Sequence, residues 1–179
     1  MFTKLDIEKY FVAEKQESLV FLVLGIVAII MALAFYFVQK TPGFRGAAYP
    51  LLILGLIQSA AGYAVFSRSD DQRINGVYAY DMNPDQLKRV ELPRMKKVSL
   101  RFKIYRKVEI AAIVCGLILV FVFRNSSVSR FWFGFGISFT LMAAELFIAD
   151  YIAEKRAIHY TGLLEQFSRP DPGSPSRPG

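Results

Sequence analysis

The sequence predicts an all-α integral membrane protein in which four transmembrane helices form two helical hairpins. Apolar residues make up 54% of the 179 residues although 21% are charged, which is unusually apolar for a soluble domain. The charges are dense between four apolar stretches and nearly absent within them, as in a chain that uses the bilayer as its apolar solvent. Basic residues are concentrated in alternate connecting segments, which is the pattern that orients a multi-pass protein.

The four apolar stretches have the lengths that membrane spans need. About 20 helical residues cross the roughly 30 Å hydrocarbon core. The predicted spans are residues 18–38, 46–67, 108–123 and 131–152. The third is the shortest, and we expect Ile104 and Tyr105 to extend it to the interface. Pro50 falls in the first turn of the second predicted span, where the missing N–H of a proline costs little.

The distribution of Lys and Arg predicts the orientation of the chain. Of the 22 basic residues, 18 precede the first span, separate the second span from the third, or follow the fourth. Segments rich in basic residues stay in the cytoplasm. We therefore expect a bacterial inner (cytoplasmic) membrane protein with both termini and the loop of residues 68–107 in the cytoplasm. The first apolar stretch is too long for a signal-peptide core, so we expect it to be retained.

Helices are also predicted outside the membrane. Residues 1–17 begin with a capping box, Thr3-x-x-Asp6, and have one apolar side, which is typical of an amphipathic interfacial helix. Residues 153–167 should continue as a cytoplasmic helix after the fourth span. Residues 168–179 contain four prolines, and we expect them to form a disordered tail.

The cytoplasmic loop of residues 68–107 should contain a turn and two helical segments. Asn75-Gly76 in the polar stretch before Asp81 indicates a turn. Asn83-Pro84 resembles an N-cap followed by proline at the first helical position, so a helix should start there. Pro93 then interrupts the pattern.

Residues 94–107 predict a basic amphipathic helix that leads into the third span. This segment has seven basic residues and no acid. Its apolar residues recur at spacings of three and four, and they are Met95, Val98, Phe102 and Tyr105. We expect the helix to lie on anionic lipid headgroups. Docking of an acidic partner is the alternative, and a nucleic-acid partner is not expected.

Three acids lie within or at the edge of predicted spans, namely Glu109, Glu145 and Asp150. Glu145 is seven residues from the cytoplasmic end of the fourth span, where a carboxylate is costly unless it is paired. Arg106 and Lys107 on the neighbouring span could reach inward to pair with it. Recognition of a partner protein and coupling to an ion or a proton are the two other interpretations of Glu145.

Polar and small residues inside the spans predict helix packing. Gln58, in the middle of the second span, should hydrogen-bond to another helix. The patterns Ala28-x-x-x-Ala32 and Gly55-x-x-x-Ser59 supply faces for close helix approach. Arg101, on the basic helix, is a further candidate for contact with a partner, together with Arg106 and Lys107.

No residue pattern indicates chemistry. Cys115 and His159 are the only residues of their types, so neither a thiol pair nor a metal site can be assembled from them in one chain. No motif supplies an activated nucleophile for His159. We therefore expect no cofactor and no enzymatic activity.

The expected function is therefore binding of a protein partner in or at the bilayer. The most concrete hypothesis is an immunity protein that neutralises a membrane-acting bacterial toxin, because a small four-helix protein without catalytic residues suits that task. An accessory or assembly subunit of a larger membrane complex fits the same features. The alternative is a small transporter or channel, at least a homodimer, in which Glu145 couples to an ion or proton.

Overall fold

The computed structural model describes residues 2–125 and 129–168, and within these residues the fold is all-helical without a strand. The predicted tail beyond Ser168 lies outside the described residues. The elements in chain order are α1 (Lys4–Ala34), the π-helical turn η1 (Phe35–Gln39), α2 (Pro42–Met82), α3 (Pro84–Gln86), the π-helical turn η2 (Leu87–Glu91), α4 (Leu92–Phe123) and α5 (Arg130–Ser168).

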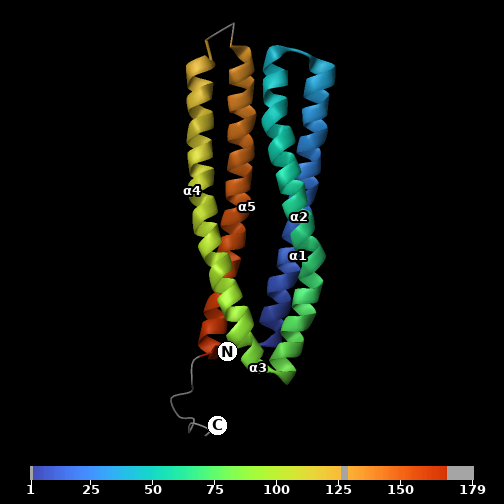
Figure 1. Ribbon diagram of the computed structural model, residues 1–179, viewed down its shortest axis with the longest axis vertical. Helices are drawn as coiled ribbons and strands as arrows, with labels where there is room; N and C mark the ends of the chain where they lie inside the picture. Colours follow the sequence, from blue (N-terminus) through green and yellow to red (C-terminus); the bar gives the residue numbers. More distant parts are fainter. Residues whose placement is uncertain (1, 126–128, 169–179) are drawn as a thin grey trace.

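At the end far from α3 the four long helices stand in the order α1, α2, α5, α4, and toward the α3 end α1 crosses α2 and α4 crosses α5 (Figure 1). The start of α1, the short α3 and the end of α5 lie at one end of the bundle. Neighbouring helices pack along the row, whereas no Cα atom of α1 lies within 8 Å of a Cα atom of α4 in the described residues. The molecule is therefore two antiparallel hairpins that join through α2 and α5 and diverge on the side of α1 and α4.

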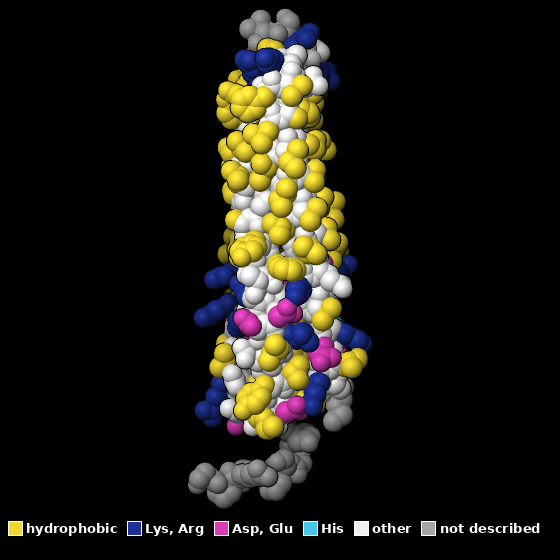
Figure 2. All heavy atoms as spheres, turned by 90° about the vertical axis from the view of Figure 1, so that its right-hand side faces the viewer, with side chains coloured by type: hydrophobic (Ala, Val, Ile, Leu, Met, Phe, Trp, Pro, Cys, Tyr) yellow, Lys and Arg dark blue, Asp and Glu magenta, His cyan; other side chains and the backbone are white. Residues whose placement is uncertain are grey.

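The bundle has an apolar half and a polar half. We call residues 18–67 and 108–152 the apolar half, and the described residues outside those ranges the polar half. Figure 2 shows hydrophobic side chains over most of the length of the bundle, acidic side chains gathered toward the α3 end, and basic side chains both there and at the opposite end. This division follows the predicted boundary between membrane and water.

Three helices are long and apolar enough to cross a membrane, namely α1 with η1, α2 and α5. Only 22–28% of the residues in their most apolar windows are buried, so most of that apolar surface faces outward. Such exposure is costly in water and favourable in lipid. The fold is consistent with a membrane protein.

The composition of α4 sets it apart from these three helices. Its last 18 residues, 106–123, include Arg106, Lys107 and Glu109, so a span-length stretch of α4 carries three charges. The third predicted span is thus the one that composition alone does not identify as membrane-spanning.

Small residues allow close approach of the helices in the apolar half, as the sequence predicted. A Cβ atom on Gly25 of α1 would lie 2.8 Å from the carbonyl oxygen of Gly55 on α2. The predicted small residues Ala28 and Ala32 are buried in the same seam. In the second hairpin, a Cβ atom on Gly116 of α4 would lie 3.2 Å from the carbonyl oxygen of Gly136 on α5. Each hairpin is thus held by a glycine-lined seam.

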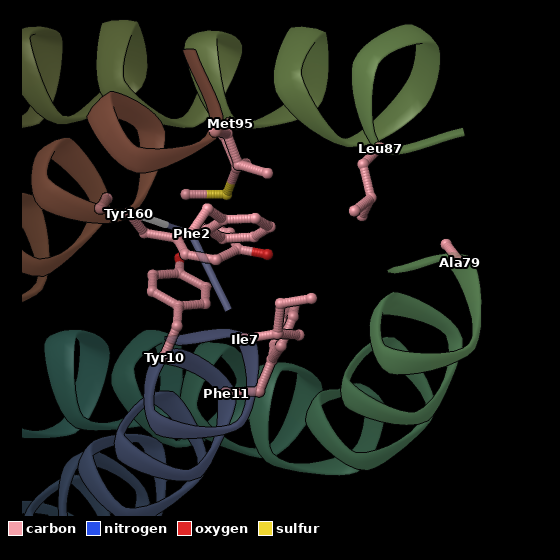
Figure 3. Packing of buried hydrophobic residues seen from close by; sticks show 10 residues of the cluster. Phe2, Ile7, Tyr10, Phe11, Ala79, Leu87, Met95 and Tyr160 are labelled. Carbon is pink, nitrogen blue, oxygen red and sulfur yellow. The ribbon is translucent and has the colours of Figure 1, made fainter. Parts of the chain in front are cut away.

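The largest buried side chains lie in the polar half, with the exception of Gln58. They form a cluster that we call the aromatic core: Phe2, Ile7, Tyr10, Phe11, Ala79, Leu87, Met95, Ala157, Tyr160 and Leu164. Figure 3 shows Tyr10 of α1 facing Tyr160 of α5, with Met95 of α4 on the other side of the Tyr160 ring. The Tyr10 and Tyr160 rings stack with centroids 4.3 Å apart. Water drives this burial, whereas lipid gives no comparable gain in the apolar half.

The predicted turn at Asn75-Gly76 is wrong, because α2 continues as one helix to Met82. Ala79 of this stretch is buried in the aromatic core. A Cβ atom on Gly76 would lie 2.9 Å from Cγ2 of Ile7 on α1. Tertiary packing thus overrides the local turn preference, and the glycine serves close approach between helices.

The prolines also differ in part from prediction. The helix α2 begins at Pro42 after the N-cap Thr41, so Pro50 lies in the helix interior and not in its first turn. Pro93 is the second residue of α4 and follows the π-helical turn η2 directly, so the regular α-helix is interrupted there, as predicted, while the helical path continues. The predicted helix start at Pro84 is confirmed.

The predicted N-terminal capping box is confirmed. The backbone N–H of Thr3 donates to Oδ2 of Asp6 over 2.8 Å, and the Thr3 hydroxyl donates to the same oxygen over 2.8 Å. These bonds, first of all the one from the hydroxyl, hold the pKa of Asp6 below its usual value. The helix that they start runs without a break from Lys4 into the first span.

The glycine seam predicts opposite effects of alanine at two positions. Gly25→Ala should lower stability by about 1–3 kcal/mol, because its methyl group meets backbone atoms of α2. Gly162→Ala, whose methyl group would have no atom within 4 Å, should raise stability by about 0.5–1 kcal/mol through its better helix propensity. Thermal unfolding followed by circular dichroism in one detergent measures both. Equal changes in stability for Gly25→Ala and Gly162→Ala would show that close approach at Gly25 does not stabilise the hairpin.

The aromatic core makes a second prediction. Met95 is fully buried in it, and Leu100, five residues further along α4, is 60% exposed. Met95→Ala should destabilise the protein by about 2–5 kcal/mol, whereas Leu100→Ala should change stability by less than about 0.5 kcal/mol. The same melting experiment compares them, and a dominant loss from Leu100→Ala would place the stabilising core elsewhere.

Candidate functional site

A groove lies in the apolar half on the side where the two hairpins diverge. Its volume is about 1150 Å³, and it is lined by α1, the start of α2, the end of α4 and the first half of α5. The walls are mainly apolar and include Met31, Phe35 and Leu141. Arg124 and Arg130 line it at the end far from α3, and Glu145 is the lining residue nearest to the polar half along α5.

Glu145 is held by Gln58, the residue for which the sequence predicted a hydrogen bond between helices. Nε2 of Gln58 donates to Oε1 of Glu145 over 2.8 Å. Gln58 is only 1% exposed, and its own Oε1 is buried and accepts no hydrogen bond from the described residues. The groove is therefore lined by the carboxylate of Glu145, which can accept further hydrogen bonds from a donor that enters it, whereas Gln58 is buried and does not line the groove.

The expected ion pair between Glu145 and Arg106 or Lys107 is not formed. Nη1 of Arg106 lies 3.2 Å from Oε2 of Glu154, which is nearly buried. Lys107 is exposed and has no acid within 4 Å among the described residues. Arg106 pairs with Glu154 at the edge of the polar half, so its side chain does not extend into the apolar half toward Glu145. Glu145 thus has no basic partner in the described part of the chain.

The two other predicted acids lie together. Glu109 of α4 and Asp150 of α5 line one narrow gap together with Arg106, Glu154 and three aromatic residues, namely Phe102, Phe147 and Tyr151. This gap has no room for water. The candidates thus divide into two separate groups, Gln58 with Glu145 at the groove and Glu109 with Asp150 nearer to the polar half.

The basic helix of residues 94–107 is part of α4, and its apolar side packs against protein. Met95 is buried in the aromatic core, and Val98 and Phe102 pack against that core. Lys96 pairs with Glu165 of α5 at 2.9 Å. Four further basic side chains are exposed and have no acid within 4 Å among the described residues: Lys97, Arg101, Lys103 and Lys107.

A second cavity lies at the boundary between the two halves. Its volume is about 310 Å³, and all four long helices line it. Its charged lining residues are Glu14 and Glu17 of α1, Arg68 of α2, Arg101 of α4, and Asp150 and Arg156 of α5. Of these six residues, only Arg101 and Asp150 were candidates from the sequence. The other four could have been found from their positions, because each lies within about one helical turn of a predicted span end on the cytoplasmic side.

The charges of this boundary cavity differ in how they are satisfied. Arg156 forms an ion pair with Glu17, and its guanidinium lies 5.4 Å from the centroid of the Tyr10 ring. Burial raises the pKa of the Glu14 carboxyl group above its usual value. Arg68 and Arg101 are exposed at the cavity and make no ion pair with the described residues. Two guanidinium groups are therefore left for a ligand.

The described residues contain no group of three or more His, Cys, Asp or Glu side chains placed to hold a metal ion. Comparison of the chain with protein-family models, with curated proteins and with solved structures finds no match in any of the three. The groove and the boundary cavity are therefore the two candidate functional sites of the chain.

Proposed function

We propose that the chain is a non-enzymatic protein of the bacterial inner membrane that acts by binding a protein partner within the bilayer. The observation that carries this proposal is the groove, which is open on the diverging side of the hairpins and contains a carboxylate without a basic partner. An unpaired carboxylate in an apolar setting is costly. A partner that brings a donor to it removes that cost.

The occupant that fits this groove is a transmembrane helix of another protein. Exposed apolar side chains in the walls, such as Val27, Met31 and Leu141, offer a surface against which a helix can pack in lipid. A Lys or Arg on the partner helix at the depth of Glu145 would complete the pair, while the buried Gln58 amide holds the carboxylate in place. The polar end of the groove thus sets the register of the partner.

The proposal includes four spans, with both termini in the cytoplasm. Support for α4 as a membrane span, the third in chain order, comes from its packing. Gly116 of α4 lies against Thr140 and Gly136 of α5 in the middle of a span. The Phe123 and Trp132 rings stack with centroids 6.4 Å apart at the far end of the same hairpin. The 18 basic residues of the cytoplasmic segments then lie on the side that the positive-inside rule requires.

Within this class, an immunity protein that neutralises a membrane-inserting toxin is the most concrete version. The groove suits that task, because a toxin helix bound in it cannot join a pore. An accessory or assembly subunit of a larger complex would use the same groove for a permanent partner.

Transport is the second candidate function, and the position of Glu145 favours it. A carboxylate in an open apolar groove also suits a cation or a proton. One chain with four spans offers a single groove, so a pathway with two faces requires at least a dimer. Proton or cation flux in proteoliposomes that Glu145→Gln abolishes would favour transport over partner binding.

The four-span arrangement predicts opposite labelling of two introduced thiols. With Cys115 replaced by Ser, Asn125→Cys after α4 should react with a membrane-impermeant thiol reagent on intact spheroplasts. Asp85→Cys in α3 should react only after the cells are permeabilised, because α4 separates the two positions. Labelling of both thiols from the same side would show that α4 does not cross the membrane.

Partner binding predicts a directional crosslink that depends on Glu145. A photoreactive amino acid at Leu141, in the groove wall, should crosslink one membrane protein in native cells. The same group at Leu117, exposed on α4 outside the groove, should not. Glu145→Gln should reduce the crosslink at least tenfold, since loss of a desolvated charge pair costs about 2–5 kcal/mol.

The matched control for this experiment is Asp85→Asn, which removes an acid from the exposed α3 and should leave the crosslink unchanged. Equal crosslinking from Leu141 and Leu117, or no effect of Glu145→Gln, would refute the groove as the partner site.

A further inference from the structure

The boundary cavity has a polar end and an apolar end, in the order that the bilayer imposes. Most of the charged lining residues lie in the polar half, for example Glu14 on α1, Arg68 on α2 and Arg156 on α5, and Asp150 lies within one helical turn of it. The other lining residues on the side of the apolar half are uncharged or aromatic, and they include Phe21 and Ala61. This gradient from charged to apolar matches a lipid whose headgroup faces the cytoplasm.

The cavity is accessible from outside the bundle. Arg68, Arg101 and Tyr105 line it and are exposed. It lies between α1 and α4, whose backbones do not approach each other in the described residues. A lipid can therefore place its headgroup in the cavity while its acyl chains remain beside the helices in the bilayer.

The charges in the cavity have both signs, and among them only Glu17 and Arg156 pair with each other. The hydroxyl of Ser69 donates to Glu14 over 3.5 Å. Arg68 and Arg101 remain without an ion pair, and Asp150 lines the same cavity from α5. Guanidinium groups recognise phosphate oxygens, and carboxylates accept hydrogen bonds from ammonium groups. The lining thus provides for a ligand that carries a phosphate and an ammonium.

We propose that the boundary cavity binds the headgroup of a phospholipid that carries both a phosphate and a primary ammonium, as phosphatidylethanolamine does. Arg68 and Arg101 hold the phosphate, and Asp150 with Glu14 accepts hydrogen bonds from the ammonium. The cavity volume of about 310 Å³ is far above the roughly 10–15 Å³ that a single water needs on the same measure, so the cavity has room for such a headgroup. This site is distinct from the groove and does not depend on a protein partner.

Native mass spectrometry of the full chain from mild detergent tests the proposal. Phosphatidylethanolamine added at increasing concentration should give a one-lipid adduct at lower concentration than phosphatidylglycerol, which has the phosphate without the ammonium. In the double variant Arg68→Gln/Arg101→Gln this adduct should need roughly tenfold or more lipid. The control Lys97→Gln/Lys103→Gln removes two exposed charges of α4 that do not line the cavity and should leave the adduct unchanged.

Three outcomes would overturn the proposal. Equal binding of the two lipids would remove the role of the acids. An equal loss in both double variants would show non-specific attraction to basic surface, and an unchanged adduct in Arg68→Gln/Arg101→Gln would place the lipid elsewhere. Soluble phosphoethanolamine is the last arm: if it displaces the lipid at equal concentration, the ligand is a soluble phosphate ester and the lipid assignment fails. Circular dichroism of each variant verifies that the helices are intact.

Discussion

The aromatic core in the polar half is the constraint on which the rest of the structure depends. Stacking of Tyr10 on Tyr160 joins α1 to α5, and Met95 brings α4 to the same cluster. In the apolar half, the hydrophobic effect gives no comparable reason for the hairpins to close, because lipid solvates their apolar side chains as well as protein does. The glycine seams hold each hairpin together. One hairpin is held to the other by the aromatic core and, at the far end of the apolar half, by close approach of α2 to α5, where a Cβ atom on Gly134 would meet the carbonyl group of Gly43. The outer helices α1 and α4 stand apart beside the joined α2 and α5.

That separation of α1 from α4 produces both candidate sites. Where α1 and α4 stand apart in the apolar half, the groove exposes Glu145, which accepts a hydrogen bond from the buried Gln58. Where they begin to separate, the boundary cavity collects the charged residues that follow the span ends on each helix. The two sites differ in chemistry because they differ in depth. At the boundary, water and headgroups stabilise both signs of charge, whereas deep in the apolar half a single carboxylate needs one defined donor.

Much of the fold could be predicted from the sequence because its signals are local or depend only on composition. The capping box at Thr3 and the small-residue faces were read correctly for that reason, and so was the hydrogen-bonding role of Gln58. Asn75-Gly76 misled because its turn preference is weaker than the packing of Gly76 on Ile7. The partner of Glu145 was also missed: choosing between Arg106 and Gln58 requires the relative rotation of α2, α4 and α5, which hydropathy does not encode. Glu14, Arg68 and Arg156 come from three different helices, and no spacing in the chain reveals that they share a cavity.

The continuity of the long helices has a mechanical consequence. The helix α2 runs for 41 residues and α5 for 39 residues without an interruption between the apolar and the polar half. A rigid rod cannot tilt at one end alone, so a molecule that separates the hairpins in the groove must also shift the rings of Tyr10 and Tyr160 against each other. Occupancy inside the bilayer is thereby converted into a displacement at the water side. A change in helix tilt in the apolar half would therefore be accompanied by a movement in the polar half, with the smallest displacement near the boundary between the two halves.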